Sequence, residues 1–172
     1  MRLLIALLLL SLTACGFHLR GPQPLAFASI YLEMNQYSDL AAGIKRSIAT
    51  SGSTRVVSKP EDAEVRLVVV ADQKEKHILS LSSTGTVREY ELRQRFAYRL
   101  IDRQGKEVQS LNEIYLARPV TFATGQELAK EQEDALLYRD MENDLIQQLM
   151  RRLAAARMNP VAPAASQSAP AK

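Results

Sequence analysis

The sequence contains few of the residues from which most active sites are built. Its 172 residues include one cysteine and two histidines, and its seven glycines are scattered singly. One cysteine allows neither an intramolecular disulfide nor a thiolate metal cluster, and no metal-binding pattern of histidines and carboxylates occurs. Scattered glycines exclude a glycine-rich phosphate loop. We therefore expect no catalytic site, metal or cofactor, and we expect the protein not to be an enzyme.

The net charge and the positions of the histidines argue against two further functional classes, nucleic-acid binders and hydrolases. The chain has 22 basic and 19 acidic residues, a formal net charge of +3, which is too balanced to indicate a nucleic-acid binder. A hydrolase with a nucleophilic serine needs a base beside that serine. The combination in this sequence that comes nearest to such a site is His77, which lies close in sequence to Ser80 and Ser82. A solvated histidine at a strand end is the simpler interpretation, and a lipid-anchored hydrolase is only a third alternative.

The first fifteen residues have the pattern of an export signal. Met1-Arg2 supplies a positive charge, and residues 3–12 are almost entirely apolar. This run is shorter than the ~20 apolar residues that span a bilayer, and a short apolar run after a charged start is typical of a secretory signal. The run ends in Leu12-Thr13-Ala14-Cys15, which resembles a bacterial lipobox. The sequence therefore predicts a signal peptide over residues 1–14 and membrane-anchoring acyl chains on Cys15, rather than a buried helix with an ordinary thiol.

Composition divides the mature chain into a tether, one domain and a tail. Residues 15–27 contain two glycines and two prolines and are expected to form a lipidated tether. Residues 28–157 are enough for one domain with a single core. Residues 158–172 consist mainly of proline, alanine and serine, which is typical of a disordered tail.

Alternation and helical periodicity predict the elements of the domain. Strands are expected over residues 28–34, 54–57, 65–71, 90–100 and 108–116. A first helix is expected between the N-cap Ser38 and Gly52, and a long second helix between residues 126 and 157. The order β-α-β-β-β-β-α predicts an α+β fold, in which a mostly antiparallel sheet of four to five strands carries two helices on one face.

The predicted strands differ in how their faces are covered. Residues 65–71 form a nearly continuous apolar run, which predicts a strand covered on both faces, and residues 73–77 leave that pattern. Residues 90–100 alternate apolar and charged side chains, which predicts one buried and one solvent-facing side. A tight turn at Asp102–Gly105 is expected to join this strand to the next as a hairpin, which Arg118-Pro119 should end.

The solvent-facing side of this hairpin is rich in arginine. Five arginines lie between residues 88 and 103, and Lys74, Lys76 and His77 precede them on the neighbouring strand. The simpler interpretation is a solvated face with cross-strand ion pairs, each of which contributes little stability. The alternative is that the planar arginine side chains bind phosphate or carboxylate groups of a ligand or partner, such as a phosphorylated glycolipid. The sequence leaves both interpretations open.

Four short motifs occur along the mature chain. They are CGFHLR at residues 15–20, GTVREY at 85–90, LAKEQE at 128–133 and LIQQL at 145–149. In this order and after a lipobox, they resemble the LptE family, also called RlpB, of lipopolysaccharide-assembly lipoproteins. The order of elements and the tail fit as well, so the likeness covers nearly all of the mature chain.

This resemblance implies partners and a location. Members of the family sit as a plug inside the large β-barrel LptD and help to assemble it, and the pair moves lipopolysaccharide into the outer leaflet. The resemblance therefore implies an LptD-like barrel and lipopolysaccharide as partners, on the periplasmic side of the outer membrane. Gly16 after the cysteine, rather than an aspartate, fits sorting to the outer membrane. The alternative is a periplasm-facing lipoprotein that binds an anionic glycolipid or polymer without a barrel.

The resemblance also implies residues that bind lipopolysaccharide. Lys130 stands where the family has a lysine at the start of its last helix. The family's second basic residue, an arginine just before the glycine of GTVREY, falls on Ser83 in this sequence. Arg88, Arg93 and Arg95 are the candidates to replace it, by charge and proximity.

Overall fold

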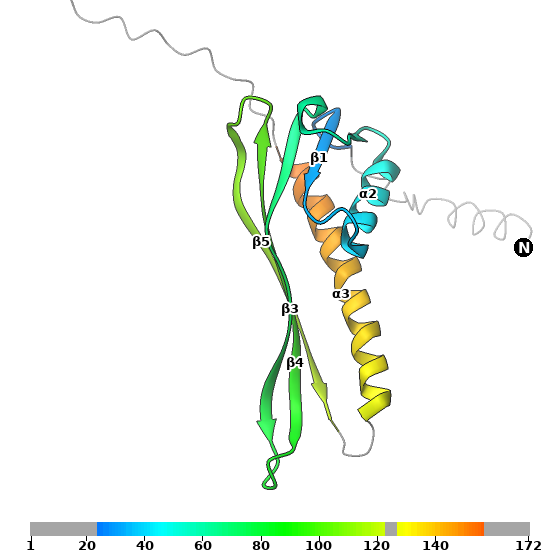
Figure 1. Ribbon diagram of the computed structural model, residues 1–172, viewed down its shortest axis with the longest axis vertical. Coiled ribbons are helices and arrows are strands. Elements are labelled where there is room, and N and C mark those ends of the chain that lie inside the picture. Colours follow the sequence, from blue (N-terminus) through cyan, green and yellow to red (C-terminus); the bar gives the residue numbers. More distant parts are fainter. Residues whose placement is uncertain (1–23, 123–126, 157–172) are drawn as a thin grey trace, which may run out of the picture.

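The computed structural model describes residues 24–122 and 127–156, which form one mixed sheet with helices on one face (Figure 1). The strands are β1 (Ser29–Glu33), β2 (Arg55–Val56), β3 (Val65–Leu81), β4 (Val87–Asp102) and β5 (Glu107–Thr121), and the helices are α2 (Asp39–Ser51), the short 3-10 helix η1 (Pro60–Asp62) and α3 (Glu127–Ala155). The expected α+β fold and the order of its elements are confirmed. The predicted signal peptide, Cys15 and the tail lie outside the described residues.

The sheet has the strand order β2-β1-β3-β4-β5. The short strand β1 pairs in parallel with β2 and β3, whereas β3, β4 and β5 are long and antiparallel. Most of the sheet is therefore antiparallel, as the sequence predicts.

Helix α2 begins and ends where the sequence indicates. The Ser38 side chain accepts a hydrogen bond from the Ala41 N–H at 3.1 Å, which satisfies one of the unpaired N–H groups of the first turn. Gly52 ends the helix with a φ of +73°, a left-handed conformation that glycine adopts without the cost of a Cβ clash.

Strand β3 differs most from the sequence-based expectation. It continues to Leu81, ten residues beyond its predicted end, and its apolar run is not covered on both faces, since Val70 is 55% exposed. Both helices pack on the same side of the sheet, which leaves the other side of this run open (Figure 1). A valine-rich run was therefore no evidence for a doubly covered strand.

A bulge in β3 decides where its lysines lie. Val69 pairs with Tyr98 and Ala71 pairs with Ala97, so Val70 is an additional residue in the ladder. One extra residue reverses the alternation of all following side chains. Lys74 and Lys76 consequently point to the helix side of the sheet and not, as expected, to the arginine-rich side.

Strand β5 also continues further than predicted. Arg118 and Pro119 do not end it, because Pro119 pairs with Glu91 and the strand runs on to Thr121. Proline has no N–H to donate, but β5 is an edge strand with one neighbour, so the missing donor costs no bond in the sheet.

The core is concentrated between the second half of α3 and the middle of the sheet. The helix contributes Met141, Leu145, Leu149 and Leu153, and β4 contributes Phe96, Tyr98 and Leu100, all of them fully buried. Leu25 and Phe27 are also buried in this core, so the packed part of the chain begins before residue 28, within the stretch that was predicted to be tether.

The rest of the molecule, here called the distal half, extends away from α2 and β1 (Figure 1). It comprises residues 74–92 of the β3–β4 hairpin, residues 117–121 of β5 with the following Phe122, and residues 127–140 of α3. Strand β1 pairs with β3 only as far as Val68. Among the described residues, the outer edge of β3 from Val69 onward therefore has no neighbouring strand.

No helix in the described part of the chain is both long and apolar enough to cross a membrane.

Candidate functional site

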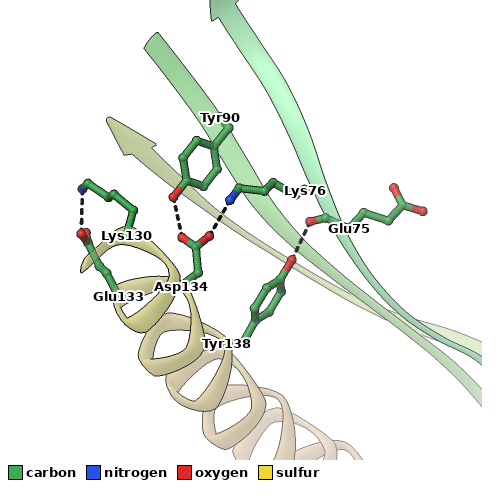
Figure 2. Close-up of polar contacts among 7 residues, drawn as sticks. All are labelled: Glu75, Lys76, Tyr90, Lys130, Glu133, Asp134 and Tyr138. Carbon is green, nitrogen blue, oxygen red and sulfur yellow. Dashed lines mark hydrogen bonds and ion pairs between the residues drawn. The ribbon is translucent and has the colours of Figure 1, made fainter. Parts of the chain in front are cut away.

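In the distal half, a polar cluster around Asp134 connects two of the sequence motifs. Tyr90, the last residue of GTVREY, donates a hydrogen bond from its hydroxyl to Asp134 Oδ1 at 2.6 Å. Lys76 on β3 forms an ion pair with the other oxygen, Oδ2, at 2.7 Å. The motif LAKEQE ends one residue before Asp134, and Figure 2 shows these side chains converging from β3, β4 and α3.

The cluster satisfies a carboxylate that the fold largely buries. Asp134 is 9% exposed and Tyr90 is 1% exposed, and a buried charge is tolerated when it is paired and hydrogen-bonded. The Lys76 ammonium also lies 4.0 Å from the centre of the Tyr90 ring, where the ring's negative face attracts a cation. Asp134, Lys76 and Tyr90 therefore hold the first turns of α3 against the sheet.

Burial and the carboxylate change the acidity of the neighbouring tyrosines. The pKa of Tyr90 is raised well above its ordinary value of 10.0, first by burial and then by its hydrogen bond to Asp134. The pKa of Tyr138 is also raised, by burial and by the nearby negative charge of Asp134. Both hydroxyls therefore remain protonated donors at neutral pH, and that of Tyr138 donates to the Glu75 carbonyl at 2.9 Å.

Lys130, the residue that the family resemblance singles out, lies at the edge of this cluster (Figure 2). Its ammonium is 2.7 Å from Glu133 Oε2, one turn along α3, and its side chain is only 15% exposed. Further along the helix, Lys74 forms a similar pair with Glu142 at 2.9 Å. Lys74, Lys76 and Lys130 thus each have a carboxylate partner already in place.

An apolar hollow of about 410 Å³ lies beside the cluster. It is lined by Lys76, Ile78, Thr86, Val87, Tyr90 and Phe122. Ile78 and, close to it in sequence, Leu81 are more than half exposed. An apolar hollow with an ammonium group in its wall suits an amphiphile, whose chain contacts the apolar side chains and whose anionic group contacts the cation.

The arginines of the open face of the sheet are held by carboxylates. Arg93 Nε is 2.6 Å from Glu91 Oε2, and Arg95 binds Glu113 through Nη2 at 2.7 Å and Nε at 2.9 Å. The hydrogen bond from Arg95 lowers the pKa of Glu113. The pair Arg95–Glu113 joins β4 to β5, as the simpler of the two interpretations expects, whereas Arg93 and Glu91 lie two residues apart on β4.

The structure does not bring the four predicted basic residues together. Lys130 lies on α3, whereas Arg93 and Arg95 lie on the opposite side of the sheet. Arg88 is exposed near the tip of the β3–β4 hairpin and forms no ion pair within the described residues, and Ser83 lies in the turn of that hairpin.

His77 shows no arrangement with the two serines proposed as its partners. It is exposed on β3 and pairs in register with Glu91, while the Ser80 hydroxyl bonds to Glu89 at 3.2 Å. Among residues 24–122 and 127–156, no three His, Cys, Asp or Glu side chains are grouped closely enough to hold a metal ion.

Asp134 is the functional candidate that the sequence analysis did not single out. It precedes Met141 by seven residues, so it belongs to the same helical stripe as the apolar core residues. A carboxylate in such a stripe is a signal that could have identified it, because a buried charge requires a partner from another element.

Comparison with known proteins identifies a family that this chain matches. A family model described as "LptE: Lipopolysaccharide-assembly" matches residues 27–153. The LPS-assembly lipoprotein LptE of Yersinia enterocolitica is 28% identical over 160 residues, which cover 88% of this chain and 73% of that protein.

Solved structures agree with the fold. The solution structure of uncharacterized lipoprotein B from Nitrosomonas europaea is 40% identical, with a TM-score of 0.68 over 81% of this chain and 91% of the other. The crystal structure of rare lipoprotein B from Shewanella oneidensis has a TM-score of 0.63 at 24% identity, covers 74% of this chain and 94% of the other, and supports the fold alone.

Proposed function

Because the chain belongs to the LptE family of lipopolysaccharide-assembly proteins, we propose that it plugs and helps to assemble an LptD-like β-barrel of the outer membrane and binds lipopolysaccharide directly. Acyl chains on Cys15 would hold it on the periplasmic side. The observation that carries this proposal is the meeting of two family motifs at the Asp134 cluster, in the part of the molecule furthest from the helix α2.

The polar surface of the sheet supports the plug. The lumen of a large outer-membrane barrel is polar, so a plug needs hydrogen-bonding groups on its outside. The open face of β4 and β5 offers the pairs Arg93–Glu91 and Arg95–Glu113, whose remaining donors and acceptors can bond to the barrel wall. Such a face would not attach to an apolar partner.

The distal half supports lipopolysaccharide binding. A phosphate group can replace the Glu133 carboxylate as the partner of Lys130, since both are oxyanions that accept hydrogen bonds from an ammonium group. Arg88 has no carboxylate partner among the described residues that a phosphate would have to displace. Arg93 and Arg95 are less available, because each already binds a glutamate. The adjacent apolar hollow can contact an acyl chain of the same ligand.

Co-purification tests the plug. The mature acylated protein, extracted from outer membranes in mild detergent, should bring down a barrel much larger than itself in equal amount. Recovery of the lipoprotein alone would contradict the plug and would favour a lipoprotein that works without a barrel.

Charge reversal tests lipopolysaccharide binding. Lys130→Glu together with Arg88→Glu should weaken binding by about tenfold or more at 0.15 M salt, because charge-assisted bonds contribute about 1.5–3 kcal/mol each. Arg139→Glu, at an exposed cation on the same helix, is the matched control and should bind normally. Equal binding by the parent, the double variant and the control would show that Lys130 and Arg88 do not contact lipopolysaccharide.

A further inference from the structure

A second hollow lies at the other end of the sheet, beside the edge strand β2. It has a volume of about 720 Å³, and its walls include Tyr31 from β1, Lys45 from α2, and Arg55 and Val56 from β2. Ser58, just after β2, completes the same wall. The hollow lies outside the Asp134 cluster and shares no residue with it.

The charged side chains that line this hollow are all positive. Lys45 and Arg55 are the charged residues in its walls, and no carboxylate lines it. Within the described residues neither cation takes part in an ion pair, in contrast to Lys74, Lys76 and Lys130 in the distal half. Two cations in the walls of one hollow, with Tyr31 and Ser58 in the same walls, are the kind of side chains that bind a phosphate group.

A neighbouring hollow extends the basic surface around Arg55. It is lined by Lys59 and Arg103 together with Glu61 and Asp62. Glu61 and Asp62 offset the charges of Lys59 and Arg103, so of these two hollows the one lined by Lys45 and Arg55 attracts an anion more strongly.

This hollow lies where the chain from Cys15 enters the domain. The Leu25 N–H donates to Ser53 Oγ at 3.0 Å, and the Arg55 N–H donates to the Ala28 carbonyl at 3.0 Å. Nine residue steps connect Cys15 to Pro24, a chain that reaches at most about 30 Å. A lipid anchor on Cys15 would therefore keep this end of the domain near the membrane surface.

We propose that the hollow of Lys45 and Arg55 binds the phosphate of an anionic phospholipid in the leaflet that holds the acyl chains. The proposal rests on the proposed lipid anchor, because the anchor brings the hollow within reach of headgroups. Arg55 contributes a planar pair of donors, and Lys45, half-buried in the wall, contributes a compact charge. Headgroup binding would fix how the domain is turned relative to the membrane, which acyl chains on a tether cannot do.

Vesicle flotation tests this binding in the absence of the anchor. The full mature chain with Cys15→Ser is mixed with vesicles of phosphatidylcholine alone or with 30% phosphatidylglycerol. The parent should bind the anionic vesicles at least about tenfold better, and Lys45→Gln with Arg55→Gln should lose about tenfold or more of this binding, since each cation near an anionic surface contributes about 1 kcal/mol. Arg139→Gln with Arg151→Gln, which removes two exposed cations of α3, is the matched control and should bind like the parent.

Three results would overturn the proposal. Equal binding to both kinds of vesicle would exclude headgroup recognition. An equal loss of binding in the control variant would show that the net charge of the protein, and not the hollow, determines vesicle binding. Saturation of the hollow by millimolar inorganic phosphate at constant ionic strength, followed by NMR of residues 45–58, would indicate a site for free anions instead.

Failure of this proposal can be distinguished from failure of the proposed function. Flotation requires neither acyl chains nor a barrel, and the Lys45 and Arg55 variant should bind lipopolysaccharide and the barrel normally.

Discussion

At the scale of single residues, the most informative position is Asp134, a carboxylate among the apolar positions of a helix. Replacing it with alanine should lower the free energy of unfolding by about 2–3 kcal/mol, because Tyr90 and Lys76 would both lose a charged partner. Glu131→Ala, an exposed acidic residue three positions earlier, should change the free energy by less than about 0.5 kcal/mol. Urea unfolding at pH 7 measures both, and equal losses would contradict a specific role for Asp134.

The Tyr90 hydroxyl should make the protein sensitive to alkaline pH. Its pKa in the folded protein is raised above the ordinary value of 10.0, so the unfolded chain loses this proton first. The stabilisation is complete below pH 10 and is lost as the pH rises further, by at most about 1.4 kcal/mol per pH unit.

Tyr90→Phe removes this ionisation. The stability advantage of the parent over Tyr90→Phe, measured by urea unfolding between pH 8 and 11, should be constant at first and shrink above pH 10. Tyr115→Phe, on the half-exposed side of β5, is the control. An advantage that grows with pH would reverse the sign of our argument.

Residue types alone indicated some of these features. Ser38 and Gly52 were identified as helix ends because capping depends on local chemistry. Lys130 was identified by resemblance. Its pairing with Glu133 follows from the spacing of the two residues along α3, but its separation from Arg93 depends on how α3 lies on the sheet. Asp134 was missed because acidic residues are common in the first turns of a helix, where they interact favourably with the helix dipole, so a carboxylate there does not stand out.

At the scale of elements, the bulge at Val70 determines which side of the sheet carries the lysines of β3. Deleting Val70 should restore strict alternation and move Lys74 and Lys76 to the arginine side. The loss of two ion pairs and the placing of the next residues against α3 should lower the free energy of unfolding by about 3 kcal/mol or more. Val70→Thr keeps the chain length and should stay within about 1 kcal/mol of the parent.

A double-mutant cycle distinguishes this effect from general damage. Lys76→Gln and Asp134→Asn should be coupled by about 1 kcal/mol in the parent and by nothing measurable in the Val70 deletion. Retained coupling would show that the bulge does not set the direction of Lys76.

The sequence predicted all five strands and both α-helices, but it predicted neither all of their lengths nor the short 3-10 helix η1. Strong alternation identified β4, and it holds because one face is buried and the other is wet. The pattern failed for β3 because the second half of this strand is exposed and charged. It is held in the sheet by its backbone hydrogen bonds to β4 and not by burial of its side chains. It failed at Pro119 because the sequence does not say which strand lies at an edge.

At the scale of the whole molecule, the two halves are held together by different forces. Near α2 the sheet and α3 share a continuous apolar core, whereas residues 128–140 of α3 bury mainly Asp134 and leave Leu128 and Leu136 exposed. Local opening should therefore cost less in the distal half. Amide hydrogen exchange should be faster at residues 128–136 than at residues 141–153, although both segments belong to one helix.

Salt should act on the distal half selectively. At 1 M NaCl the ion pairs of Lys74, Lys76 and Lys130 are screened, so exchange at residues 128–136 should accelerate while the apolar half changes little. A uniform response along α3 would contradict two differently stabilised halves.

The unpaired edge of β3 has a consequence for the time before the protein meets any partner. Strand edges with unpaired backbone groups are where copies of a protein join into aggregates. Along this edge the chain places Lys74, Glu75 and Lys76, and the Tyr138 hydroxyl covers the Glu75 carbonyl. A second copy that approached in extended form would bring like charges together and would have to displace a side chain from α3. The same lysines that secure the helix thus protect newly made chains from joining edge to edge.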